Sequence, residues 1–207
     1  HGVYARRFDA AGVPAGSQFL VNSASTNSTQ EMPGIDAFAA GGYIITWQSS
    51  ATLATGGDGS GYGVYAQRFN TDGTPVGALF RANTTTSGSQ YESDVATHAD
   101  GSFVVTWRSD SQDGSGAGIY FQRFNAAGAP QGAETLANTL TAGNQYEAKV
   151  ATLGGGGFVI VWRDDSGADG SGNGVFGQRF DAAGNKLGAQ FLVNETTSGG
   201  QYQPDVV

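Results

Sequence analysis

The apolar residues of this chain fall in short runs of strand length, separated by polar segments rich in Gly, Asn, Asp and Ser. In the run 103–107, Phe103, Val105 and Trp107 share one face of an extended strand, while Val104 and Thr106 share the other, because side chains alternate along a strand. Both faces are largely apolar, as expected for a sheet that packs between two other sheets. No stretch shows helical apolar periodicity over several turns, so the sequence predicts essentially no helix.

The runs recur with a period of about 55 residues, which identifies an internal repeat. Each full unit contains four strand-like segments, bounded by turn residues and rich in β-branched and aromatic side chains. The second segment ends in Trp47, Trp107 or Trp162, and the third ends in a Gln/Arg-Arg-Phe sequence. The segments of the first and fourth type begin at Glu31, Tyr91, Tyr146 and Tyr202, and at Gln18, Leu79, Glu134 and Gln190, respectively.

A four-residue turn joins the third segment to the fourth, with Asp or Asn first and Gly last. Asx side chains cap type I turns, and Gly takes the positive φ that follows, so these two segments are predicted to form an antiparallel hairpin. The four turns are 9–12, 70–73, 125–128 and 181–184.

Four antiparallel strands in a repeat of this length predict an all-β, β-propeller-like array of four-stranded antiparallel blades, with about four repeats of which the fourth is incomplete. A β-solenoid would need shorter repeats, and a row of separate β-sandwiches would need about seven strands per unit. We expect a single repeat-built domain over 1–207, with units at about 1–29 (partial), 30–89, 90–144, 145–200 and 201–207 (partial). The first full unit carries an insertion near 49–57. The incomplete fourth unit is expected to pair with a neighbouring chain or with flanking sequence, because an open sheet edge invites pairing.

Composition narrows the function classes. The net charge of −8 argues against nucleic acid or an anionic membrane surface as a partner, and no apolar run reaches the length of a membrane helix, so membrane insertion is not expected. Glycine contributes 34 of 207 residues, which fits a chain with many turns. There is no Cys, so a disulfide framework is excluded.

The loops between the second and third segments are the first candidate for a site, because each gathers carboxylates around Gly. A hard cation with oxygen ligands would relieve the repulsion between them, and Ca²⁺ is favoured over Zn²⁺ since Cys is absent and His nearly so. The alternative is that these Asp-Gly-Ser-Gly sequences are plain turns. The candidate ligands are Asp58, Asp110, Asp113, Ser115, Asp165, Asp169 and Ser171.

Aromatic and cationic residues recur at fixed places in the unit. The tryptophans are expected to fill the space between blades, and the Arg of the third segment (Arg68, Arg123, Arg179) to bind Asp94, Asp205 or strand-end carbonyls. His98 is expected to be a solvated surface residue. A sugar-binding alternative, with one site per blade, would use Tyr91, Tyr146, Tyr202, Trp107 and Trp162.

No hydrolase, metalloprotease or P-loop motif is present, and nothing at this stage breaks the repeat symmetry in the way an active site would. Asp164 and Asp165 are adjacent in one loop, which is a poor geometry for an opposed acid and base. The sequence therefore predicts a protein that is not an enzyme. An enzyme acting on glycans through Asp165 or Asp110 is the rival hypothesis.

The run 63–77, GVYAQRFNTDGTPVG, is followed by the first-type strand, a GSFVVTW-type strand and a DGSG loop. In this it resembles the tandem repeats of very large secreted bacterial proteins, the calcium-binding, RTX-like adhesins and surface proteins. The resemblance covers the whole chain, but the first unit departs from it at Glu31 and Gly34. It implies a secreted, extracellular, cell-surface location and a structural or adhesive role, possible calcium binding, and partners among surface glycans, proteins or copies of itself. The alternative reading is a lectin-like propeller.

Overall fold

The computed structural model describes residues 2–23, 29–50 and 60–207, and in this part of the chain the fold is all-β. Three four-stranded antiparallel sheets follow one another along the chain, and we call them blades 1, 2 and 3. A short two-stranded sheet, the N-terminal hairpin (2–22), precedes them. The predicted absence of helix is confirmed within the described residues, apart from one 3-10 turn at Gly154–Gly156.

The strands occur in sequence order within every sheet, so each predicted unit forms one blade. The N-terminal hairpin consists of β1 (Tyr4–Ala5) and β2 (Phe19–Leu20). Blade 1 contains β3 (Gln30–Ala37), β4 (Tyr43–Ser49), β5 (Gly63–Phe69) and β6 (Pro75–Arg81). Blade 2 contains β7 (Gln90–Thr97), β8 (Phe103–Asp110), β9 (Ala117–Phe124) and β10 (Thr135–Leu136). Blade 3 contains β11 (Gln145–Thr152), β12 (Phe158–Asp164), β13 (Gly174–Phe180) and β14 (Phe191–Leu192).

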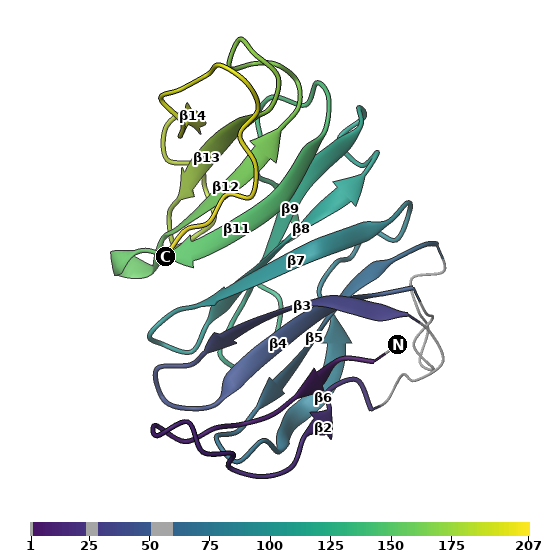
Figure 1. Cartoon of the computed structure of the whole chain (residues 1–207), viewed down its shortest axis with the longest axis vertical. Coiled ribbons are helices and arrows are strands. Elements are labelled where there is room, and N and C mark those ends of the chain that lie inside the picture. Colours follow the sequence, from purple (N-terminus) through teal and green to yellow (C-terminus); the bar gives the residue numbers. More distant parts are fainter. Residues whose placement is uncertain (1, 24–28, 51–59) are drawn as a thin grey trace.

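The blades stack face to face, with the N-terminal hairpin at one end of the long axis and blade 3 at the other (Figure 1). The first strands of the blades, β3, β7 and β11, lie side by side. Segment 201–207 was expected to form a further first strand, but it has no assigned strand. It still packs on blade 3, since Val206 contacts the buried cluster of Ala151, Val159 and Val161.

Apolar layers between successive units hold the stack together, as the two apolar faces of each second strand predict. The three tryptophans occupy equivalent places in three successive layers and are at most 1% exposed. Burying a large aromatic side chain contributes on the order of 2–3 kcal/mol. The expectation that the tryptophans fill the space between blades is confirmed.

Each layer is built on a stacked aromatic pair that receives another ring from the preceding unit. The pairs join the first residue of the second strand to the last residue of the third, with centroids 4.8–5.2 Å apart: Tyr43–Phe69, Phe103–Phe124 and Phe158–Phe180. The rings that pack on them are Phe19, Phe80 and Phe121, in that order. The repeated Phe at the end of the third strand is therefore half of a docking surface for the unit before it.

A buried Asn–Gln pair ties the fourth strand of one unit to the next unit. Asn138 is fully buried; its Oδ1 accepts a hydrogen bond from the Ile119 N–H at 2.8 Å, and its Nδ2 donates to Gln145 Oε1 at 3.0 Å. Asn83 makes the same bonds to Val64 N–H and to Gln90. The pair forms beside a two-residue fourth strand (β10) and beside a seven-residue one (β6) alike.

The predicted turns between third and fourth strands are confirmed. In the turn at 181–184, Asp181 Oδ1 accepts from the Ala183 and Asn185 N–H groups, and Gly184 has a φ of 85°. Glycine is required here for a second reason. A Cβ on Gly184 would lie 2.8 Å from Nε of Arg123, which reaches over from blade 2.

Candidate functional site

The inner edge of the stack, where the first strands lie side by side, is bridged by side chains rather than by a sheet ladder. Asp94 Oδ2 on β7 accepts a hydrogen bond from the Val150 N–H on β11 at 3.0 Å. Asp36 Oδ2 on β3 accepts from the Thr97 N–H on β7 at 2.7 Å. Carboxylates thus satisfy main-chain donors that face the next blade, and these bonds between charged and neutral groups are the stronger kind.

A β-bulge in each first strand adds a second set of bridges. The bulge residues Glu92 and Glu147 have positive φ values of 56° and 54°, as do Met32 and Gln203 at the equivalent positions. Positive φ is uncommon for residues other than Gly and is strained, and it is retained where the surroundings fix it. Here the N–H of Glu147 donates to Glu92 Oε2, and the N–H of Gln203 donates to Glu147 Oε2. The bulge therefore turns each N–H toward the preceding blade.

Beside the bulges, tyrosine and arginine side chains alternate across the blades. The Arg108 guanidinium lies 4.6 Å from the ring centroid of Tyr91 and 4.5 Å from that of Tyr146. The Arg163 guanidinium lies 4.3 Å from Tyr146 and 5.4 Å from Tyr202. We call this row of five residues the Tyr–Arg ladder. Burial raises the pKa of the Tyr91 and Tyr146 hydroxyls, and hydrogen bonds to Asp110 and Asp165 act in the same direction.

The middle of the inner edge holds a cavity of about 370 Å³, which we call the inner groove. Four charged side chains line it, from β3, β7, β11 and segment 201–207: Asp36, Asp94, Lys149 and Asp205. Burial raises the pKa of Asp94, although the Val150 N–H and Lys149 both oppose the shift. Lys149 Nζ lies 3.6 Å from Asp94 Oδ1. The groove thus holds half-buried and exposed carboxyl groups around one ammonium group, that of Lys149.

One repeat position supplies three of these four charges and breaks the repeat symmetry. Gly34, Asp94, Lys149 and Asp205 are equivalent along the four first-type segments. From the sequence, Gly34 stood out as a departure from the repeat, but Lys149 did not, because Asp94 and Asp205 were considered only as partners for Arg. Aligning the four first-type segments residue by residue shows this change of charge at one repeat position.

The predicted cation ligands are engaged in other bonds. Asp110 Oδ2 accepts from the Tyr91 hydroxyl at 2.6 Å, and Asp165 accepts from the Asn144 N–H and the Tyr146 hydroxyl. Asp113 and Asp169 each cap a turn by accepting from the N–H of Ser115 and Ser171, at 3.0 Å in both cases.

The described residues contain no group of three or more acidic or His side chains placed to hold a metal ion. Asp58 lies outside the residues that the structure describes. The plain-turn interpretation accounts for these bonds, and Ca²⁺ at the loops stays a prediction.

The residues of the sugar-binding alternative differ in how far they are buried. Trp107 and Trp162 have no exposed surface, so their indoles cannot reach a sugar. Tyr202 is 57% exposed, and Tyr91 and Tyr146 are half-buried in the ladder. Only the tyrosines of that set can contact a ligand.

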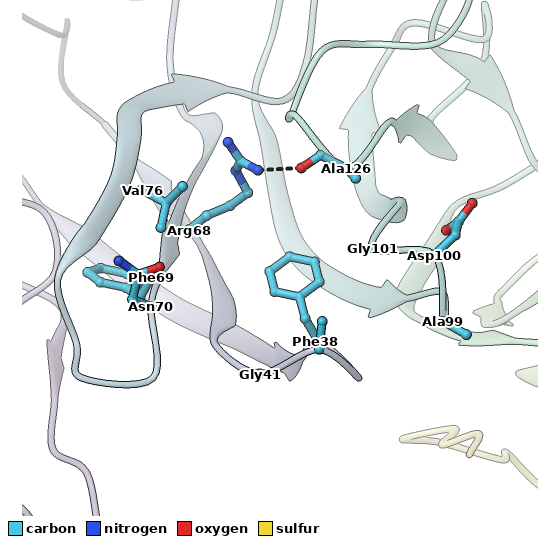
Figure 2. A pocket seen from close by; sticks show the side chains of 11 residues that line it. Phe38, Gly41, Arg68, Phe69, Asn70, Val76, Ala99, Asp100, Gly101 and Ala126 are labelled. Carbon is cyan, nitrogen blue, oxygen red and sulfur yellow. Dashed lines mark hydrogen bonds between the residues drawn. The ribbon is translucent and has the colours of Figure 1, made fainter.

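Arg68 and Arg123 of the third strands bind main-chain carbonyls, one of the two expected kinds of partner, and do not bind Asp94 or Asp205. Figure 2 shows Arg68 beside a cavity of about 310 Å³ between blades 1 and 2, with its guanidinium directed at Ala126. Arg68 donates to the Ala126 and Ala127 carbonyls at 2.5 and 2.8 Å, and Arg123 donates to the Ala182 carbonyl at 2.6 Å. The arginine side chain thus bridges a gap between two neighbouring blades.

His98 lines another cavity and is half-buried, so the expectation of a solvated surface residue is wrong. Burial lowers the pKa of the His98 imidazole.

Comparison with known proteins gives structural likeness without sequence likeness. No protein-family model and no curated protein matches the chain. Among solved structures it is similar to an endo-arabinase from Bacteroides thetaiotaomicron (TM-score 0.56, 16% identity, 88% of this chain and 68% of that one). It is also similar to the Hadza microbial sialidase Hz136 (0.56, 11%, 80% and 37%) and to Zg3597, a family 117 glycoside hydrolase from Zobellia galactanivorans (0.52, 12%, 96% and 63%). The chain thus spans between about a third and about two thirds of the length of these proteins.

At these identities the likeness concerns the fold, which is propeller-like as the repeat predicts. The comparisons contradict the prediction of a non-catalytic structural or adhesive module, and with it the prediction that the chain is not an enzyme. The three solved structures named above are an endo-arabinase, a sialidase and a glycoside hydrolase. Within the described residues no helix is long and apolar enough to cross a membrane. A secreted location and a resemblance to bacterial surface adhesins stay predictions.

Proposed function

We propose that this chain forms part of a carbohydrate-active enzyme that cleaves glycosidic bonds, with the inner groove as its substrate site. The observation that carries the proposal is the repeat position 94, 149 and 205, where two carboxyl groups and one ammonium group face a single cavity. The structural likeness to an endo-arabinase, a sialidase and a glycoside hydrolase supports it. A cavity of about 370 Å³ lies within the usual range for small-ligand pockets.

Asp94 is suited to the role of general acid. Hydrolysis of a glycosidic bond needs one carboxyl group that holds its proton near neutral pH and gives it to the leaving oxygen, and burial raises the pKa of such a group. Burial raises the pKa of the Asp94 carboxyl above its ordinary value, which is the direction that a general acid needs. After the transfer, the Asp94 carboxylate is stabilised by Lys149, whose Nζ lies 3.6 Å away, and by the Val150 N–H.

Asp205 is suited to the second carboxylate role, as a base toward water or as a nucleophile toward the anomeric carbon. It is exposed, and one oxygen, Oδ1, accepts from the Val206 N–H at 3.0 Å, which leaves Oδ2 for the reaction. Asp36 is less suited, because both its oxygens already accept main-chain hydrogen bonds, Oδ1 from Ala37 and Oδ2 from Thr97.

The test is the release of reducing ends from glycans by the purified chain. The panel contains arabinose-containing polysaccharides and sialylated glycans, chosen after two of the structural neighbours, together with common β-linked polysaccharides. We expect cleavage of one class and a fall in kcat of about 10²–10⁴-fold on Asp94→Asn, which keeps an acceptor for the Val150 N–H but cannot donate an acidic proton.

Asp100→Asn is the matched control, since Asp100 lies in the next turn of the same blade and does not line the inner groove. Its kcat is expected to be unchanged. Absence of cleavage across the panel would overturn the proposal, as would an Asp94→Asn variant that cleaves as fast as the parent while both have the same melting temperature.

A further inference from the structure

The charged side chains that line the inner groove are mostly carboxylates. Asp36 on β3 and Asp94 on β7 come from the blades, and Asp205 comes from segment 201–207. Lys149 on β11 is the one cation among the described residues that line the groove, so the carboxylates of the blades alone outnumber it. The net charge of the whole chain, −8, adds a field of the same negative sign around the groove.

Lys149 already has an anionic partner inside the groove. Its Nζ lies 3.6 Å from Asp94 Oδ1, and the Asp94 side chain is only 19% exposed. A ligand carboxylate bound at Lys149 would therefore lie beside a second carboxylate in a partly buried place, where water screens their repulsion poorly. The groove has one cation, and that cation neutralises a carboxylate of the protein.

Arg108, in the Tyr–Arg ladder beside the bulges, is likewise not available to a ligand. Its guanidinium lies between the rings of Tyr91 and Tyr146, and its edge faces Glu92 at 3.6 Å and Asp110 at 3.2 Å. The side chain is 17% exposed. Both the faces and the edge of this cation are thus taken up by side chains of blades 2 and 3.

Arg163 is engaged in the same way one blade further along. Its guanidinium lies 4.3 Å from the ring centroid of Tyr146 and 3.4 Å from Glu147 Oε1, and its side chain is 20% exposed. Arginine is the residue whose planar fork matches a carboxylate with two hydrogen bonds. Neither arginine of the ladder offers that fork to a sugar acid.

We infer that the substrate of the inner groove is a neutral glycan, and that the groove discriminates against glycans that carry carboxylates, such as sialylated or uronate-containing chains. The inference rests on the proposed function of the groove as a substrate site. Hydroxyl groups of a neutral sugar can donate to the groove carboxylates and accept from the Lys149 ammonium group without bringing a charge with them. A sugar acid would add a negative charge to a site that already has an excess of them.

Two derivatives of one polysaccharide test the inference. A neutral arabinan and a neutral β-glucan are each prepared in a carboxymethyl and a hydroxyethyl form with the same low degree of substitution. The two groups are similar in size, but only the carboxymethyl group is charged. We expect kcat/KM to be lower by about tenfold or more for the carboxymethyl form at low ionic strength. The difference should shrink in about 0.5 M NaCl, because salt screens the repulsion.

A charge-removing variant shows whether the groove itself discriminates. Asp36→Asn takes one negative charge out of the groove and is expected to narrow the difference between the two forms by about threefold. Asp181→Asn is the matched control: it removes the same charge in the turn 181–184, outside the groove, and Asn is the residue found at the equivalent position 125. Its discrimination should equal that of the parent. If Asp36→Asn does not fold, the salt dependence of the parent carries the test.

The outcomes separate this inference from the proposed function. Equal kcat/KM for the two forms at low salt, or cleavage of sialylated glycans ahead of neutral ones, would overturn the inference and leave the enzyme proposal intact. Native electrophoresis in gels that contain each derivative covers the opposite case. A chain that cleaves nothing but is retarded by the hydroxyethyl form alone would overturn the enzyme proposal and support a neutral glycan as ligand. A chain that neither cleaves nor binds any of these glycans would overturn both.

Discussion

The Arg108 guanidinium is held between two tyrosine rings, 4.6 Å from that of Tyr91 in its own blade and 4.5 Å from that of Tyr146 in the next. It also lies 3.6 Å from Glu92 and donates to Asp110 at 3.2 Å, and its side chain is 17% exposed. A planar cation placed between two aromatic faces is attracted by both, and lysine lacks the planar group that stacks on them. One side chain of blade 2 therefore fixes the position of the first strand of blade 3.

Replacing Arg108 by Gln, the residue found at the equivalent position 48, is expected to lower the free energy of unfolding by about 2 kcal/mol, because two partly buried cation–π contacts are lost. Denaturant unfolding measures the change. Arg6→Gln is the control: Arg6 is exposed, lies 5.8 Å from the Phe8 ring and donates one long hydrogen bond to the Gly16 carbonyl, so a loss below about 0.5 kcal/mol is expected. Equal losses for the two variants would show that the ladder does not join the blades.

Replacing Asn138 by Ala is expected to lower the free energy of unfolding by about 3 kcal/mol, since the buried Ile119 N–H and the Gln145 side chain lose their partner together. Asn194→Ala removes the equivalent bond, to the Val175 N–H at 2.8 Å, at a site that is only half-buried. Water can replace the lost partner there, so a smaller loss is expected. Thermal and denaturant unfolding of both variants give the comparison, and a larger loss at Asn194 would contradict it.

The raised pKa of Asp94 predicts a pH dependence of stability. In the folded chain this group keeps its proton to a higher pH than in the unfolded chain, where a carboxyl titrates near 3.9. Its favourable contribution is therefore fully present below the unfolded pKa and is lost as pH rises through the folded pKa. Relative to Asp94→Asn, the parent should lose stability as pH rises from about 4 into this window.

Chemical unfolding of the parent and of Asp94→Asn, followed between about pH 3 and pH 8, measures that difference. Asp100→Asn is again the control and has the opposite sign, because hydrogen bonds from Ser102 lower the pKa of Asp100. A difference between parent and Asp94→Asn that grows in favour of the parent as pH rises would show that Lys149 outweighs burial at Asp94.

Calcium at the Asp-Gly-Ser-Gly loops predicts that the melting temperature falls on addition of a chelator and is restored by excess Ca²⁺. The buried Oδ2 atoms of Asp113 and Asp169 have no partner within the described residues, which makes these two carboxylates the ones to change. The double variant Asp113→Ala, Asp169→Ala should then melt at the same temperature with and without chelator. A parent protein whose melting temperature does not respond to chelator would remove Ca²⁺ from the loops.

Local patterns predicted the blades well because every strand and turn depends on residues near one another in the sequence. The alternation 103–107 placed Trp107 in the core, and Asp181 with Gly184 specified a turn through two hydrogen bonds and one positive φ. The role of Asp94 was not found in this way. Its partner, the Val150 N–H, is 56 residues away, and the bond exists only because β7 and β11 lie side by side.

The same distance in sequence explains why two kinds of partner, carboxylates and strand-end carbonyls, stayed open for the third-strand Arg. From sequence, Asp94 was a chemically reasonable partner for Arg68 or Arg123. In the structure the angle between blades carries each Arg over the turn of the following unit, where carbonyls accept its hydrogen bonds. A pattern of residue types shows which partners a side chain can bind chemically. It does not show which of these partners the neighbouring blade places within reach.

The sequence by itself determined the repeat, the four strands of each unit, the turns and the buried tryptophans, because periodic burial and turn chemistry act over a few residues. Only the tertiary structure decided which charges meet at the inner edge and which carbonyls receive the third-strand arginines. Those depend on how successive blades are stacked, and the stacking is set by contacts between residues about one repeat apart.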